Sequence, residues 1–512
     1  MMPDCKKSKH GQLNPVDRLS DLPDFIMHHI ISFLDFKEAC RTCILSRRWT
    51  RISDTNPVLL VTRPRRNVSD GNTASLEYIE TRMQRYSKEN LRIKKLRIEF
   101  SIDVEFACKV DEWLEIAVRS KVENLVLENH FNDVYQLTDI LLSAKSLRTL
   151  DCTGVELPYY KAMNLASLES LFLFEVTVEE RMLNQITSLC LSLKHLGLSC
   201  CSGCKNIVIP RSSTLETLYL TESLPFGGTV ILETTSLEYF EYIGGNDYDD
   251  HWPVISKPSF LRNLRKLEIS YVSIADEVLS KLLSELTLLE VLMLRTCRLM
   301  STIRISSSRL REIRFIYLGN LLDVLINAPR LKMFKYKGQF YQSSSIVINS
   351  QAGCDISLHT TPNNLQTEGF VKLKKLISGL SSCYVLKVLL IDDMHQELEC
   401  DDVKFNEEEL GNIQLGPPCN VKELKLTLSS WILSKSSFSA FLDGLFWICH
   451  PEIISLRVCI RSQHLTLESL ISKLEDMARC RRHPLKRVEV GGTNCSKLLY
   501  SRKLDVKLKL FW

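Results

Sequence analysis

Residues 215–220 read LETLYL, and the same spacing of apolar residues recurs at LRTLDC (147–152), LESLFL (168–173) and LKHLGL (193–198). In each copy, apolar side chains occupy the first, fourth and sixth positions. Further copies extend the pattern in both directions and begin at Ile93, Val122, Leu237, Leu264, Leu289, Leu310 and Leu331. Between Leu147 and Leu331, successive copies start 21 to 27 residues apart. This period predicts a stack of short strands, each followed by a return segment.

The C-terminal part continues the pattern less regularly. The copies LKVLLI, VKELKL, IISLRV and LKRVEV begin at Leu386, Val421, Ile453 and Leu485, and CDISLH at Cys354 is a further candidate strand. Helical spacings of apolar residues fill the gaps at 370–380 and 467–477. We therefore expect irregular repeats with inserted helices over 346–512.

The repeats closely resemble leucine-rich repeats, which stack into a solenoid. Because strand side chains alternate between two faces, the fourth and sixth positions should point into the core and the intervening positions to the concave face. The expected concave face carries aromatic residues followed by Met293 and a basic group that includes Lys337. From this face we select as target-binding candidates Phe172, Phe174, Tyr219, Tyr239, Arg295, Arg314 and Lys335. Aromatic contact area beside charge suits protein recognition, although the aromatics would be equally explained if they packed only on each other.

The N-terminal stretch 17–49 reads DRLSDLPDFIMHHIISFLDFKEACRTCILSRRW, and its apolar residues recur at helical spacings. Asp35 followed by Glu38 predicts the start of a second short helix. Ser46 is a suitable N-cap for a third helix that carries Trp49. So short a segment has little core of its own, so its apolar residues are expected to meet another protein.

This segment resembles an F-box, with its Leu-Pro start, ISFL centre and LSRRW end. With the repeats, the chain is similar to plant F-box proteins with leucine-rich repeats; HPLKRVEVGGTN near Leu485 is only faintly similar to the FBD region that many of them carry. The expected fold is α/β, with a three-helix F-box before an irregular horseshoe solenoid. The expected parts are a disordered N-terminus (1–16), the F-box (17–60), a linker and capping helix (61–90), repeats (91–345) and irregular repeats (346–512).

The resemblance implies a substrate-recognition subunit of an SCF-type ubiquitin ligase, which docks on a SKP-type adaptor and through it on a cullin. The implied adaptor-binding residues are Leu22, Pro23, Ile26, Ile30, Leu34, Leu45 and Trp49. Catalysis would belong to other subunits, so no catalytic residue and no cofactor are expected. Two alternatives remain: a scaffold that does not direct degradation, and a receptor assisted by a small molecule or inositol phosphate.

Composition limits the cellular compartments and the kinds of partner that the sequence allows. No apolar run reaches the length needed to span a membrane. The start MMPDCKKSKHGQ lacks the apolar core of a secretory signal, so we expect the protein to be located in the cytoplasm or nucleus. The 18 cysteines are then expected to be reduced. Residues 1–100 hold 19 Lys/Arg against 12 Asp/Glu. No nucleic-acid motif accompanies this charge, so nucleic acid is disfavoured as a partner.

Three other clusters invite a functional interpretation. SCCSGC holds Cys200, Cys201 and Cys204, but no second cysteine pair stands at zinc-site spacing, so we expect packing and no metal. The acidic run 392–409 lacks calcium-loop spacing and is expected to be a solvated loop. The loop GGNDYDDHWP (244–253) carries Trp252, which is either a contact residue or an anchor that folds back onto the repeats.

Overall fold

The computed structural model describes the following residues: 19, 21–34, 36–62, 72–100, 104–129, 135–157, 165–211, 213–223, 228–245, 252, 254–256, 258–298, 300–318, 323–337, 345–350, 354–360, 366–378, 383–390, 403–406, 416–428, 435–459, 471, 472, 474, 487–491 and 503–511. The chain divides into two compact units. The first comprises Met1–Val178 with Leu189–Leu193, and the second comprises Glu179–Ser188 with Lys194–Trp512. The expected N-terminal segment 1–16 lies outside the described residues.

The first unit begins with a helical module, defined as α1 (Asp24–Ile31), α2 (Phe36–Thr42) and α3 (Arg47–Asp54). Pro23 occupies the N-cap position of α1. The Ser46 side chain accepts a hydrogen bond from the Trp49 backbone N–H at the start of α3, as expected. Asp35, the expected cap of α2, lies outside the described residues.

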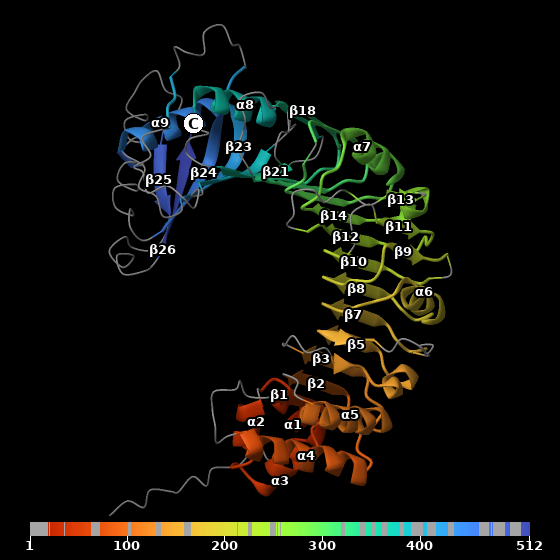
Figure 1. Ribbon diagram of the computed structural model, residues 1–512. Helices are drawn as coiled ribbons and strands as arrows, with labels where there is room; N and C mark the ends of the chain where they lie inside the picture. The colour runs from red at the N-terminus through yellow and green to blue at the C-terminus, as the bar shows by residue number, and fades with distance from the viewer. Residues whose placement is uncertain are drawn as a thin grey trace, which may run out of the picture. The chain divides into compact units, whose positions relative to one another are not determined.

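Parallel strands follow the module in the first unit (Figure 1). The elements are β1 (Val58–Thr62), α4 (Asn72–Lys88), β2 (Lys95–Phe100), α5 (Val104–Arg119), β3 (Asn124–Asn129), β4 (Tyr135–Gln136), η1 (Asp139–Ser143), β5 (Thr149–Thr153), β6 (Val155–Glu156) and β7 (Ser170–Phe174). The strands pair in the order β1, β2, β3, β5, β7. Residues 58–62 were not expected to form a strand, because they lack a copy of the repeat motif.

The second unit also contains a sheet of parallel strands. Its main sheet runs through β8 (His195–Ser199), β10 (Thr217–Thr221), β12 (Tyr239–Ile243), β14 (Lys266–Ser270), β15 (Val291–Arg295), β17 (Glu312–Ile316), β19 (Met333–Lys337) and β21 (Cys354–Thr360). From β5 to β19, each main-sheet strand begins two residues after the first residue of a repeat motif. In LETLYL, Leu215, Leu218 and Leu220 are fully buried. The predicted repeats and their core positions are therefore confirmed.

A left-handed residue ends many of the repeat strands. Gly154, Glu175, Cys200, Glu222, Tyr271, Thr296 and Tyr317 each directly follow a strand and have φ between 47° and 63°. In several repeats the backbone N–H of this residue donates to the last carbonyl of the next strand, as Glu222 does to Ile243 and Tyr271 to Arg295. This bond satisfies a backbone donor at the point where the chain turns away from the sheet. It thus fixes the same corner in successive repeats.

Return segments form helices and smaller parallel sheets in the second unit. The helical elements are α6 (Glu180–Leu189), η2 (Pro258–Asn263) and α7 (Asp276–Glu285). One small sheet joins β9 (Asn206–Ile209), β11 (Thr229–Leu232) and β13 (Val254–Ser256). Another joins β16 (Thr302–Ser306), β18 (Asp323–Asn327) and β20 (Ser345–Asn349). None of the described helices is long and apolar enough to cross a membrane.

The C-terminal repeats have longer strands and inserted helices. They comprise α8 (Thr367–Ser378), β22 (Cys383–Leu390), β23 (Cys419–Leu428), α9 (Lys435–Ile448), β24 (Cys449–Cys459), β25 (Arg487–Gly491) and β26 (Lys503–Phe511). Figure 1 shows α8 and α9 beside these strands. The helices pack tightly, because a Cβ added at Gly444 of α9 would lie 2.4 Å from the Phe370 ring of α8. β26 pairs antiparallel with both β24 and β25, so here the sheet departs from the parallel repeat.

Candidate functional site

The helical module folds around a small apolar core. Its buried members are Met27, Ile31, Ala39, Trp49 and Ile52, and Leu22, Ile30 and Leu34 pack against them while partly exposed. Trp49 is only 2% exposed. Replacing a buried tryptophan with alanine typically costs about 3–5 kcal/mol. Trp49 therefore stabilises the module and offers little surface to a partner.

Arg48 joins the start of α1 to α3. Its Nη2 lies 2.6 Å from Asp24 Oδ1 and also donates to the Leu22 carbonyl at 2.6 Å. Arg51 Nη2 lies 3.7 Å from the other Asp24 oxygen. The hydrogen bond from Arg48 lowers the pKa of the Asp24 carboxyl below its usual 3.8. Asp24 is therefore ionised at neutral pH and helps to hold Leu22 and Pro23 in place.

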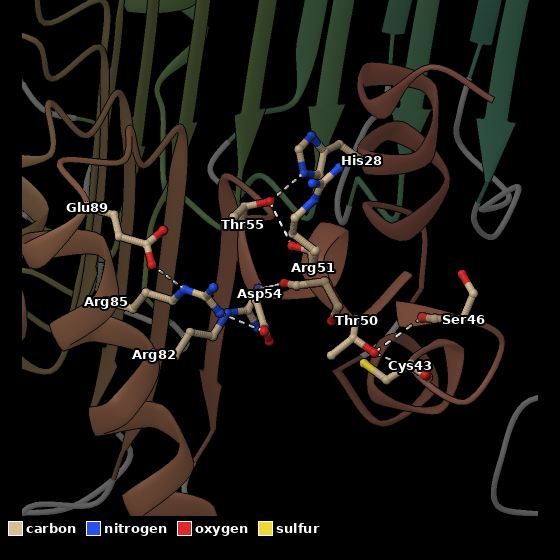
Figure 2. Close-up of polar contacts among 11 residues, drawn as sticks. His28, Cys43, Ser46, Thr50, Arg51, Asp54, Thr55, Arg82, Arg85 and Glu89 are labelled. Atoms are coloured by element: carbon tan, nitrogen blue, oxygen red, sulfur yellow. Dashed lines mark hydrogen bonds and ion pairs between the residues drawn. The ribbon is translucent and has the colours of Figure 1, made fainter. Parts of the chain in front are cut away.

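Polar contacts tie α3 to α4, the helix beside the first repeats (Figure 2). Arg85 Nη1 lies 2.7 Å from Asp54 Oδ2, and Arg85 Nε lies 2.8 Å from Glu89 Oε1. Arg82 donates to the Ser53 carbonyl. Nearby, His28 of α1 and Thr55 are hydrogen-bonded at 3.2 Å. The helical module is thus fixed directly against α4.

Large apolar side chains are exposed on this module. In the described part of the chain, five of fifteen exposed large apolar residues fall within 19–45: Leu19 (54%), Phe25 (69%), Phe33 (76%), Ile44 (86%) and Leu45 (59%). Leu45 and Pro23 are the members of the expected docking set that are exposed; Leu22, Ile26, Ile30 and Leu34 are half-buried. Phe33 and Ile44 were not among the predicted docking residues. Helical spacing marks apolar positions but does not distinguish the ones facing solvent.

The outward face of the first unit carries two predicted aromatics on β7. Leu171 and Leu173 are buried, whereas Phe172 is half-buried and Phe174 is 40% exposed. This alternation is the one that the repeat motif predicts for a strand with one buried face. Phe172 and Phe174 therefore lie on the face opposite the core.

In the second unit, the predicted aromatics Tyr219 and Tyr239 contact each other on adjacent strands. Their ring centroids lie 5.2 Å apart at 84°, an edge-to-face geometry. The Tyr239 hydroxyl donates to Glu241 at 2.8 Å, and Lys266 Nζ lies 4.1 Å from the Tyr239 ring centroid. Burial and the Glu241 contact raise the pKa of Tyr239, so it remains a neutral donor. The two rings thus belong to a local polar network and are only partly available to a partner.

The predicted cations Arg295, Arg314 and Lys335 come together on successive strands of the second unit. Arg314 on β17 lies opposite Lys335 on β19, and Arg295 on β15 lies two residues beyond Met293, the residue opposite Arg314. All three are half-buried. Met293 was expected on the same concave face, but it is only 8% exposed. Its side chain is therefore covered, although strand alternation alone predicted that it would face solvent.

Two family comparisons bear on the module and the repeats. The F-box domain model matches residues 19–60, which include α1–α3. The leucine-rich-repeat domain model of At1g61320/AtMIF1 matches residues 83–246 and 253–501, which is more than half of the chain. The chain is an F-box protein with leucine-rich repeats of the At1g61320/AtMIF1 family.

Relatives of this F-box/leucine-rich-repeat protein come from Arabidopsis thaliana. The putative F-box/LRR-repeat protein At5g02930 is 24% identical over 248 residues, covering 48% of this chain and 51% of that protein. The F-box protein At5g03100 is 28% identical over 205 residues, covering 40% and 62% respectively. The putative F-box/LRR-repeat protein At1g56400 is 28% identical over 266 residues, covering 44% and 50%. The chain therefore spans about half to two thirds of the length of these relatives.

The three other clusters have structural surroundings within the described residues. Trp252 packs edge-to-face on Tyr242 with ring centroids 5.3 Å apart, which favours the anchor interpretation. Cys201 and Cys204 are buried, and burial raises the pKa of Cys204 to about 11. In the described part of the F-box protein, His, Cys, Asp and Glu side chains form no group suited to a metal ion. Of the acidic run, only 403–406 lie among the described residues.

Proposed function

We propose that this chain is a substrate-recognition subunit of an SCF-type ubiquitin ligase. Its F-box would dock on a SKP-type adaptor that connects it to a cullin, and its repeats would bind a target protein. The supporting observation is the group of exposed apolar residues on the F-box. Phe33 and Ile44 are 76% and 86% exposed while the core of the same module is closed. A concentration of large exposed apolar side chains in one short module supports a protein-interaction surface there.

The proposed docking residues divide into two kinds. Pro23, Phe33, Ile44 and Leu45 would contact the adaptor directly, because their side chains are solvent-accessible. Leu22, Ile26, Ile30, Leu34 and Trp49 would support that surface from partly or fully buried positions. Apolar anchors at the centre of an interface commonly carry most of the binding energy.

The proposed target-binding residues are Phe172, Phe174, Tyr219, Tyr239, Arg295, Arg314 and Lys335, on the outward faces of the two units. Binding a target there would raise its effective concentration near the catalytic subunits, so this chain itself need not perform covalent chemistry. The role would place the protein in the cytoplasm or nucleus, the compartments expected from the sequence.

Affinity purification of the tagged full chain, with the proteasome inhibited, tests this proposal. We expect the adaptor and cullin to co-purify with the wild-type protein and both to be reduced in the Leu22→Ala/Pro23→Ala variant. Recovery of the adaptor without a cullin would favour a scaffold that does not direct degradation. Absence of both from the wild-type sample would overturn the proposal.

A further inference from the structure

Positive side chains gather on four of the five neighbouring strands from β15 to β22 in the second unit. Parallel pairing aligns Arg314, Lys335, Ser357 and Lys387 in one row across β17, β19, β21 and β22. The adjacent row contains Arg295, Ile316, Lys337 and His359. With strands about 4.8 Å apart, the row from Arg314 to Lys387 spans about 14 Å. We call Arg295, Arg314, Lys335, Lys337 and Lys387 the cationic cluster.

Little negative charge balances this cluster. Arg314 pairs with Glu312, and Lys337 lies over the Tyr317 ring at 4.6 Å. Among the described residues, Arg295, Lys335 and Lys387 form no ion pair. The Arg295 Nε is buried and has no hydrogen-bond partner in the same part of the structure. A buried donor without an acceptor is costly, and an anion bound at the cluster would balance the charge of the same guanidinium.

The pKa values of two residues at the cationic cluster reflect the positive charges that surround them. Burial lowers the pKa of Lys335, and the charges of Arg314, Lys387, Lys337 and Arg295 lower it further. Burial and three lysines also lower the pKa of His359 to about 4. The cluster therefore repels further positive charge at a half-buried site.

We propose that the cationic cluster binds a phosphorylated serine or threonine in the target segment. This rests on the proposed function, since the segment belongs to the protein that the repeats bind. A phosphate carries a charge of about −1.5 to −2 and three acceptor oxygens at neutral pH. Arg295 and Arg314 present guanidinium donors, which match phosphate geometry, while Lys335 and Lys387 add positive charge.

A compact dianion fits the cluster better than a long polyanion. On the strands before β15, the outward positions include Glu241 on β12 and Glu268 on β14, in the row that leads to Met293 and Arg314. A nucleic-acid strand that followed this face would approach the half-buried Glu241 and leave the positive part of the sheet, whereas Glu268 is buried and paired with Lys266. A single phosphorylated side chain would remain on the positive part of the sheet, and its flanking residues could extend toward Tyr239 and Tyr219.

Retention of a phosphopeptide pool by the full-length protein tests the site. The probe is an immobilised pool of nonapeptides with central phosphoserine and randomised flanks, compared with the same pool carrying unmodified serine. We expect stronger retention on the phosphoserine pool, and at least tenfold weaker retention of Lys335→Glu/Lys387→Glu. Lys281→Glu, at an exposed lysine of α7 in the same unit, should bind like the wild type. Thermal unfolding checks that the variants are folded. The milder substitution Arg295→Gln should also weaken retention of the phosphoserine pool.

Equal retention on the two pools would overturn the proposal. So would retention of the Lys335→Glu/Lys387→Glu variant on the phosphoserine pool that is as strong as that of the wild type. Inositol hexakisphosphate and a single-stranded RNA serve as further probes; binding of either through Lys335 and Lys387, without selectivity for phosphoserine, would also overturn it. The adaptor pull-down is independent of this surface and should be unchanged in the variant. If the wild type does not bind the adaptor but still prefers the phosphoserine pool, the ligase role is contradicted and the phosphate site is still supported.

Discussion

Arg85 of α4 and Asp54 of α3 form an ion pair with 2.7 Å between Nη1 and Oδ2, so the F-box and the helix that follows it are joined directly. The Tyr86 hydroxyl adds a second connection by donating to the Asn56 carbonyl, and Tyr86 is fully buried. The sequence predicted a linker between the two parts. The structure shows that the folded elements on either side of residues 63–71 contact each other.

Arg85→Ala should loosen the F-box without unfolding the repeats. The ion pair is partly exposed and contributes less than about 1 kcal/mol, so the effect should appear as faster amide hydrogen exchange in α3 and α4. Lys88→Ala, at an exposed position on the same helix, is the control. Identical exchange in the two variants would mean that Arg85 does not couple these helices.

Gly154→Ala should destabilise the first unit. Gly154 has φ +63°, and an added Cβ would lie 2.5 Å from the Asn129 carbonyl oxygen. The left-handed conformation alone costs a residue with a Cβ about 1–2 kcal/mol, and the clash adds to this. Gly416→Ala is a matched control, because Gly416 has φ +69° with nothing within 4 Å of the added atom. Thermal unfolding should therefore show a larger loss for Gly154→Ala; equal losses would contradict the close approach.

The free energy of unfolding should decrease as the pH falls from about 6.5 to about 4. His359 has a folded-state pKa of about 4 against its usual 6.5, chiefly because it is buried. In this window the unfolded state binds the proton more readily, so protonation favours unfolding. The facing charges are Lys335 and Lys337 on β19 and Lys387 on β22. Chemical denaturation at several pH values should give a shallower slope for His359→Asn, and an unchanged slope would refute the assignment.

Cys201→Ser and Cys204→Ser should behave as packing changes. Both thiols are buried, and burial together with nearby Glu180 keeps Cys204 protonated at neutral pH. Each substitution buries a hydroxyl in place of a thiol, which costs about 1–3 kcal/mol if the hydroxyl lacks a partner. A chelator should leave the melting temperature of the wild type unchanged. Stoichiometric zinc that disappears with either substitution would contradict this account.

The repeat stack was predictable because its signal is local. Leu215, Leu218 and Leu220 indicate a half-buried strand within six residues, and the same spacing recurs along the chain. The strand β1 and the antiparallel β26 were not predicted, because they contribute to the sheet without the motif. Their partners are distant in sequence, as for Leu456 of β24 and Val506 of β26.

The candidate surfaces were predictable only in part. Arg295, Arg314 and Lys335 follow from strand alternation, but Lys387 joins them through a repeat whose spacing is irregular, so its register could not be inferred from the period. On the F-box, Trp49 was expected to make or support the adaptor contact, and its burial leaves it only the supporting role. Ile44 was not predicted, because solvent exposure in a turn between helices depends on how the helices pack.

The affinity of the purified full chain for a SKP-type adaptor tests the central claim most directly. Isothermal titration calorimetry should show binding by the wild type and at least about 30-fold weaker binding by Phe33→Ala/Ile44→Ala, corresponding to about 2 kcal/mol. Val278→Ala, which truncates a 46% exposed side chain on α7, should bind like the wild type. No binding by the wild type, or equal affinities for all three proteins, would contradict adaptor docking through the F-box.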